Sequence, residues 1–146
     1  MPPDTTFGAP LIGQTENALR AILDRELAGT GLTAPQWMVL TLTTAAGGPI
    51  ARDRLAGRLA SALKLSESQA QTHITALAAG RLLHAPDDRG TVSVTGAGRE
   101  LQRAIRCRIA DIGQLLWGDL QTEDLATAAR VLGTVLARAN QELSQV

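Results

Sequence analysis

The chain has 146 residues, 45% of them hydrophobic and 19% charged, with 14 basic and 14 acidic side chains. This length fits one domain, residues 1–146, and leaves no room for two full-sized domains. No apolar run approaches the length needed to cross a bilayer. Met1 to Pro10 lacks the basic start and long apolar run of a secretory signal. We therefore expect a cytoplasmic protein with no membrane partner.

Aromatic side chains are almost absent, since Trp37, Trp117 and Phe7 are the only ones. The core must therefore consist of Leu, Ile, Val and Ala. Small side chains let helices approach closely but bury little area each. This composition favours a protomer that completes its core against a partner.

The net charge is zero, but the charges are unevenly placed along the chain. The segment 52–108 holds ten basic and five acidic residues, whereas the two flanking segments are net acidic. Nucleic-acid binding depends on the local field and not on the total charge. The pattern is consistent with a basic face for nucleic acid, and equally with an ordinary solvated helix surface.

The first two predicted helices follow a loose arm, Met1 to Pro10, that contains three prolines. Apolar side chains at helical spacing predict a helix over 11–28. A second helix runs to about Ala45, with Thr33 as N-cap and Gln36 as its capping-box partner. Leu32 and Trp37 are spaced as a hydrophobic staple, which explains Trp37 structurally and leaves open a second role in a ligand pocket.

A third helix is predicted over 51–63, with Leu55 and Leu59 on its buried side. The same spacing places Arg52, Arg54 and Arg58 together on a solvent-facing side. All three are candidates for phosphate contacts.

The fourth predicted helix has the same start signals as the second, with Ser66 as N-cap and Gln69 three residues later. It runs to Ala79, and its inner stripe is Ala70, Ile74 and Leu77. Its outer face carries hydrogen-bonding side chains without the Lys and Glu of a solubilising surface. Such side chains can read base edges in a major groove. The candidate DNA-reading residues are Ser66, Ser68, Gln69, Gln71, Thr72 and Thr75.

A short two-stranded wing is predicted after Gly80, with strands at 82–84 and 91–95. The turn Pro86 to Gly90 joins them, and Arg89 lies at its tip. Arg89 is placed either for a phosphate or minor-groove contact, or for pairing with Asp87 or Asp88.

Two further apolar-striped helices fill the segment 97–144, interrupted at Gly118, with Thr122 as a candidate cap and Glu123 and Asp124 in the last helix's first turn. Pairing of the segments 11–28 and 97–144 between two protomers would make a homodimer. The two reading helices would then lie roughly 34–36 Å apart, about one turn of DNA.

Few residues are candidates for catalysis, redox chemistry or metal binding. Cys107, the single cysteine, lies inside a predicted helix and is either an inert small side chain or an oxidant sensor between two arginines. His73 is either a half-buried, hydrogen-bonded residue or a ligand contact or pH-sensitive hinge. These residues and His84 form no metal site, and no phosphate loop, nucleophile elbow or triad is present. We predict neither an enzyme nor a cofactor.

The chain resembles the MarR-type transcriptional regulators, the multiple-antibiotic-resistance regulator family, from about Leu11 to Leu143. The residues that carry the resemblance are Leu32-Thr-Ala-Pro-Gln-Trp37, Leu55-Ala56 with Leu59, Leu65-Ser66 with Ser68, Ile74 and Leu77, Asp87-Asp88-Arg89, and Val94-Thr95 with Gly98.

The resemblance implies a mainly α winged helix-turn-helix protein with its DNA-binding core at 32–95 and dimerisation helices on both sides. It further implies a homodimeric repressor that binds a pseudo-palindromic operator in double-stranded DNA. A small phenolic or aromatic ligand would release it. The alternative is a winged-helix module that binds protein through the same surface, favoured by the zero net charge, the short wing and the uncharged Thr72.

Overall fold

The computed structural model describes residues 5–86 and 90–145, which form six helices and three short strands. The predicted turn residues Asp87, Asp88 and Arg89 lie outside the described residues. The chain forms two compact units, Met1–Ile109 (unit 1) and Ala110–Val146 (unit 2), and each is described by itself. The elements are α1 (Ala9–Leu27), α2 (Ala34–Ala45), β1 (Ile50–Ala51), α3 (Arg52–Leu63), α4 (Glu67–Ala79), β2 (Leu83–His84), β3 (Thr91–Val94), α5 (Gly96–Trp117) and α6 (Thr122–Leu143).

The start of α1 differs from the prediction, because the helix begins at Ala9 and not at residue 11. Pro10 lies in its first turn, where a missing backbone N–H costs no hydrogen bond and the fixed φ suits a helix. The expectation that Pro10 belongs to a loose arm is therefore wrong.

The start of α2 confirms the predicted capping box. The Thr33 hydroxyl accepts from the backbone N–H of Gln36, and the Gln36 side chain accepts from the backbone N–H of Thr33. Leu32 is buried, and Trp37 packs against the core. Side chains thus satisfy two of the free N–H groups of the first turn.

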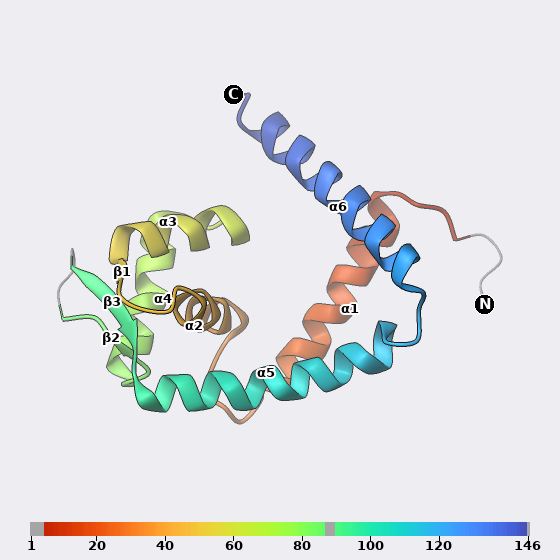
Figure 1. The fold of residues 1–146 in the computed structure, drawn as a ribbon. Coiled ribbons are helices and arrows are strands. Elements are labelled where there is room, and N and C mark those ends of the chain that lie inside the picture. The colour runs from red at the N-terminus through yellow and green to blue at the C-terminus, as the bar shows by residue number, and fades with distance from the viewer. Residues whose placement is uncertain (1–4, 87–89, 146) are drawn as a thin grey trace. The chain divides into compact units, whose positions relative to one another are not determined.

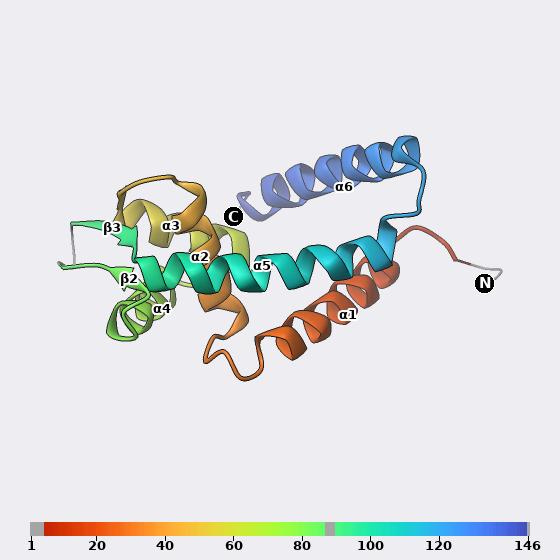
Figure 2. The same cartoon turned by 60° about the horizontal axis from the view of Figure 1, so that its bottom comes forward.

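The sheet has three strands in the order β1-β3-β2, all antiparallel, where the sequence predicted only two. Ile50 pairs with Val92, and Leu83 pairs with Val94. The missed strand β1 is two residues long and follows Pro49 directly, so it carries no alternation that a pattern could detect. Figures 1 and 2 show α2, α3 and α4 grouped beside the strands, with α5 leading directly out of β3.

The core of unit 1 is built from aliphatic side chains, as the composition predicts. Leu40, Leu55, Leu59, Ile74 and Ile105 are fully buried and come from α2, α3, α4 and α5. The predicted inner stripe of α4 is confirmed, since Ala70, Ile74 and Leu77 are all buried. One continuous cluster therefore fixes which face of α4 points outward.

Unit 2 contains the end of α5 and all of α6, and none of the residues of α6 is buried. Thr122 is the first helical residue, and Gln121 occupies the N-cap position without a side-chain hydrogen bond, so the expectation that Thr122 caps the helix is wrong. Glu123 and Asp124 lie in the first turn as predicted, where they favour the positive end of the helix dipole. Within the described residues, no helix combines the length and apolar character needed to cross a membrane.

The junction between the sheet and α5 depends on Thr95 and Gly98. The Thr95 hydroxyl donates to the carbonyl oxygen of Arg81 at 2.8 Å and accepts from the backbone N–H of Gly98 at 3.0 Å. A Cβ atom on Gly98 would collide with the backbone carbonyl oxygen of Leu82. A side chain at this position would push α5 away from the wing.

We expect Gly98→Ala to lower the free energy of unfolding by about 1–3 kcal/mol, the usual cost of forcing a methyl group into a packed site. Urea denaturation followed by circular dichroism measures it. Gly96→Ala is the matched control, because a Cβ there meets no atom within 4 Å. Equal stabilities of the two variants would contradict the close approach at Gly98.

Candidate nucleic-acid interface

The helix α4 begins with the predicted capping box. The Ser66 hydroxyl accepts from the backbone N–H of Gln69 at 3.1 Å, and Oε1 of Gln69 accepts from the backbone N–H of Ser66 at 3.0 Å. Both side chains had been predicted to read DNA. In the structure both already hold the first turn, which leaves them less hydrogen-bonding capacity for a base.

The outer face of α4 is the one predicted from the sequence. Ser68, Thr72 and Thr75 are exposed, and Gln71 is half-buried. The Thr72 hydroxyl donates to the carbonyl oxygen of Ser68 at 3.0 Å, so its oxygen remains available as an acceptor. These four side chains are uncharged and carry hydrogen-bonding groups, and the exposed carboxylate of Glu67 lies one turn before Gln71.

Arg52 does not lie where the sequence predicted it. The side chain is only 5% exposed, so the expectation that it shares a solvent-facing side with Arg54 and Arg58 is wrong. Its guanidinium donates from Nε to Oε1 of Gln71 at 2.6 Å and from Nη2 to the hydroxyl of Thr75 at 2.7 Å. A buried cation requires such acceptors, and α4 supplies them. Arg52 thus connects α3 to the outer face of α4.

Asp53 joins the same network, and the sequence analysis did not single it out. Nε2 of Gln71 donates to Oδ1 of Asp53 at 3.3 Å. Asp53 and Gln71 are 18 positions apart, on two helices whose rotation about their axes depends on the core. No local sequence pattern predicts this hydrogen bond. Only the knowledge that both residues lie where α3 contacts α4 could have predicted it.

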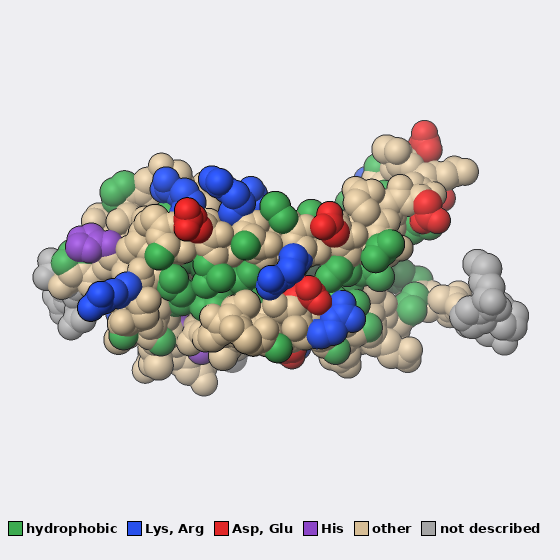
Figure 3. All heavy atoms as spheres, turned by 90° about the horizontal axis from the view of Figure 1, so that it is seen from below, with side chains coloured by type: hydrophobic (Ala, Val, Ile, Leu, Met, Phe, Trp, Pro, Cys, Tyr) green, Lys and Arg blue, Asp and Glu red, His purple; other side chains and the backbone are tan. Residues whose placement is uncertain are grey.

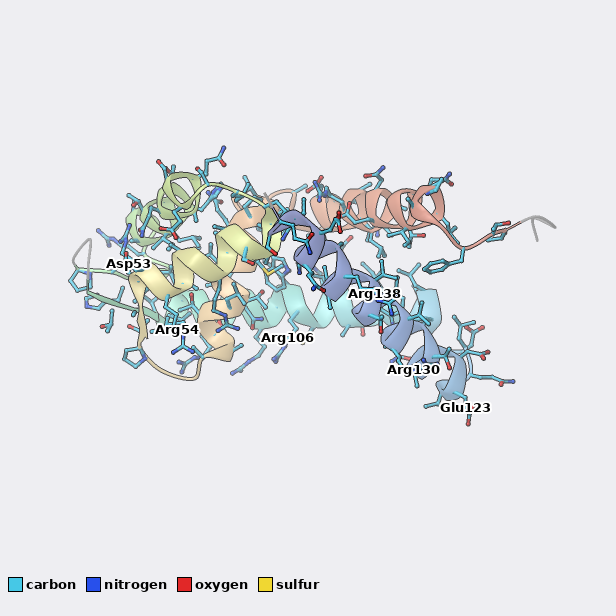
Figure 4. The ribbon with its side chains drawn as sticks, turned by 90° about the horizontal axis from the view of Figure 1, so that it is seen from above. Asp53, Arg54, Arg106, Glu123, Arg130 and Arg138 are labelled. Carbon is cyan, nitrogen blue, oxygen red and sulfur yellow. The ribbon has the colours of Figure 1, made fainter. Side chains whose placement is uncertain are left out.

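Figure 4 shows Asp53 on the side of α3 that faces α4, whereas Arg54 projects from the other side. Arg54 and Arg58 are both exposed, and their spacing of four residues places them on one side of the helix. They form a basic edge on α3. This edge is separate from the outer face of α4.

The wing connects to α3 through the backbone. The N–H of Arg52 donates to the carbonyl oxygen of Gly90 at 3.0 Å, just before β3. Its side chain reaches α4, so one residue contacts both the wing and the helix beside it. The predicted wing residue Arg89 lies outside the described residues.

Charged side chains are spread thinly over one face of the molecule. Figure 3 shows basic and acidic groups on the face seen from below, with wide areas that carry neither. The basic residues of the segment 52–108 include the exposed Arg54 and Arg58.

A pocket of about 320 Å³ in unit 1 lies between α1 and α2. Trp37 contributes to its wall, together with Leu19, Leu23 and Met38. Glu16 and Arg20 also line it and form an ion pair at 2.9 Å. His73, the other predicted ligand residue, is half-buried on α4 and is not among the residues that line this pocket.

Cys107, which lies inside a helix as predicted, is exposed on α5. Over the described part of the chain, no three His, Cys, Asp or Glu side chains gather where they could hold a metal ion.

A capped helix with a polar outer face, beside a small antiparallel sheet, defines a winged helix protein. No family model and no curated protein sequence matches this chain.

Solved structures do match most of the chain. A MarR family transcriptional regulator from Silicibacter pomeroyi is 23% identical, with 92% of this chain and 90% of that chain covered and a TM-score of 0.76. MepR from S. aureus, solved as a DNA complex, is 19% identical over 88% of this chain and 94% of that chain, with a TM-score of 0.73. CouR from Rhodococcus jostii, solved with p-coumaroyl-CoA, is 16% identical over 86% of this chain and 88% of that chain, with a TM-score of 0.72. The chain therefore has the MarR-type winged helix fold, and the predicted fold class is confirmed.

Proposed function

We propose that the protein is a DNA-binding transcriptional regulator, and no enzyme, that inserts α4 into the major groove. The observation that carries this proposal is the outer face of α4, where the exposed Ser68, Thr72 and Thr75 and the half-buried Gln71 present hydroxyl and amide groups. Groups of this size match the hydrogen-bonding pattern of base edges. The exposed Arg54 and Arg58 supply phosphate contacts along α3.

The solved structures support this proposal. MepR, which shares the fold, was solved as a complex with DNA. We propose that this chain binds a pseudo-palindromic operator as a repressor in the cytoplasm. A protein-binding module on the same fold is the alternative, and DNA binding separates the two.

We expect Thr72→Glu to lower affinity for selected operator DNA at least tenfold, because it places a carboxylate on the face that meets the polyanion. Glu favours a helix as well as Thr does, so folding is retained. Fluorescence anisotropy with labelled duplexes, at about 50 and 200 mM salt, measures the affinity and its salt dependence.

Thr134→Glu is the control for this change. Thr134 is an exposed residue of α6, and its hydroxyl donates to the carbonyl oxygen of Arg130, four residues earlier. The hydroxyl of Thr72 donates to the carbonyl oxygen of Ser68 in the same way. The control variant therefore adds the same charge at a similar position on another helix. If the wild-type protein binds no duplex at low salt, the proposal is overturned and the protein-binding alternative is favoured.

We further propose that the protein is a homodimer joined through its terminal helices. Unit 2 by itself leaves a large apolar surface exposed, with Leu136 and Leu143 both 61% exposed and Leu132 46% exposed. Soluble monomers rarely leave a contiguous patch of this kind uncovered. The exposed large apolar residues of unit 2 are Leu115, Leu116, Trp117, Leu120, Leu132, Val135, Leu136 and Leu143.

Leu136→Glu is expected to weaken dimerisation at least tenfold, because a carboxylate would be buried without a partner. Analytical ultracentrifugation over a range of concentrations measures the change. Thr134→Glu is again the control, since two residues along a helix correspond to a rotation of about 200°. A wild-type chain that sediments as a monomer at micromolar concentration would contradict the proposal.

The pocket between α1 and α2 is proposed as the site of a small effector that releases the DNA. Its volume, about 320 Å³, fits a small organic molecule. Trp37 offers an aromatic wall, and Arg20 would exchange its partner Glu16, 2.9 Å away, for a carboxylate or phenolate group of the ligand. The ligand would act by binding one dimer geometry more tightly than another.

We expect phenolic carboxylic acids such as 4-hydroxybenzoate to change the tryptophan fluorescence through Trp37. The change should persist in Trp117→Phe, which leaves Trp37 as the only tryptophan, and should disappear in Trp37→Phe. A response that survives only in Trp37→Phe would place the ligand elsewhere.

A further inference from the structure

A hollow of about 310 Å³ lies between the end of α4 and the strand β2, and we call it the α4–β2 hollow. Ala78 borders it from α4. This residue follows Thr75 by three positions, so it lies on the outer face of the helix. Arg81, His84 and Thr95 border the hollow from the chain that forms the base of the wing. The hollow therefore lies where the outer face of α4 meets the wing.

The backbone of Arg81 is held from both sides. Its N–H donates to the carbonyl oxygen of Ala78 at 3.0 Å, and its carbonyl oxygen accepts from the Thr95 hydroxyl at 2.8 Å. Its φ angle of 63° lies in the left-handed region, which glycine adopts without strain and other residues avoid. An arginine at such a position, directly after Gly80, points to a role for its side chain.

The side chains of Arg81 and His84 are available for a ligand. Both residues are exposed, and no hydrogen bond or ion pair joins either side chain to another described residue. A guanidinium has five N–H donors, and even a neutral imidazole has one. Leu83, Ala85 and Pro86 complete the wall, so no described residue that lines the hollow carries a carboxylate. This chemistry suits an anion.

The place of the hollow suits an anion of DNA in particular. The major groove is only about 12 Å wide, so a helix inside it has a strand of phosphates on each side. Ala78 lies about 4.5 Å beyond Thr75 along the axis of α4, and Arg81 follows two residues after the helix ends. On the side of α4 that faces α3, the exposed carboxylate of Asp53 lies beside Gln71 and would repel a phosphate. The side toward β2 is therefore the better one for a phosphate strand.

We infer that the α4–β2 hollow is a phosphate site, in which Arg81 and His84 bind a phosphodiester of the DNA strand that passes between α4 and the wing. The inference rests on the proposed DNA binding and adds one contact to it. Arginine often binds a phosphate through two parallel hydrogen bonds, which fix its orientation. Such a contact carries no sequence information, so it would set the position of α4 in the groove and not the choice of base.

The salt dependence of DNA binding tests the charge of Arg81. Arg81→Gln should lower the affinity for selected operator DNA about tenfold, and should reduce the slope of log K against log salt by about one for each bound copy of the chain. Arg81→Lys keeps the charge and should keep the slope. Fluorescence anisotropy between about 50 and 200 mM salt measures both quantities. Arg106→Gln is the matched control, because Arg106 is exposed and projects from α5 on the side turned away from α4 (Figure 4).

Neutral methylphosphonates, placed one at a time along the operator, locate the phosphate. At one position, or at two adjacent positions, the substitution should lower the affinity of the wild-type protein about tenfold. It should change that of Arg81→Gln less than twofold, because the partner charge is already absent. His84→Ala should show the same coupling with a smaller loss. If no position is coupled to Arg81, or if Arg81→Gln keeps the wild-type salt slope, the inference is overturned.

The free energy of unfolding separates this role from a structural one. Arg81→Gln should match the wild-type protein in urea denaturation, because the side chain is exposed and both backbone hydrogen bonds remain. A less stable variant with unchanged salt dependence would place Arg81 in a contact within the protein and overturn the inference. If the wild-type protein binds no duplex, the proposed function itself fails. Specific binding without coupling to Arg81 refutes the phosphate site alone.

Discussion

The aliphatic core shared by α2, α3, α4 and α5 is the constraint on which the rest of unit 1 depends. Leu40, Leu55, Leu59, Ile74 and Ile105 are fully buried without a single aromatic side chain among them. Such residues pack closely, and each contact fixes the rotation of a helix about its axis. Because Ile74 and Leu77 point inward, Ser68, Thr72 and Thr75 must point outward. The same packing turns Arg52 inward from the first turn of α3.

The polar contacts then refine what the core has set. Both α2 and α4 start with reciprocal capping boxes, which place the first turn of each helix at a defined residue. Gly98 lets α5 approach the backbone of Leu82. The Thr95 hydroxyl stabilises this contact, because it donates to the carbonyl oxygen of Leu82 and accepts from the backbone N–H of Gly98. Arg52 adds a connection from the wing to α4. Each of these contacts is short in range, and together they leave α4 little freedom relative to the sheet.

The elements whose signals are local could be predicted from the sequence. The N-caps Thr33 and Ser66, the inner stripe of α4 and the extent of α5 all depend on residues within a few positions of one another, and the structure confirms them. Helix ends were misplaced by one or two residues at Pro10 and Thr122, and the larger errors occur where distant residues decide. Arg52 was placed outside because helix spacing alone does not tell which side of a first turn meets a neighbour. Strand β1 exists only because Thr91 and Val92 pair with it.

The two units present surfaces of opposite character, and this contrast carries the argument for their roles. The outer face of α4 presents hydroxyl and amide groups, and only a partner with matching donors and acceptors replaces water there without loss. The exposed apolar side chains of α6 would be stabilised by any apolar partner that excludes water from them. The same helix of a second copy is such a partner. A dimer formed through α6 would display α4 twice. In the proposed dimer, two copies of α4 would double the number of bases contacted, which would compensate for the weak electrostatic attraction of a chain with no net charge.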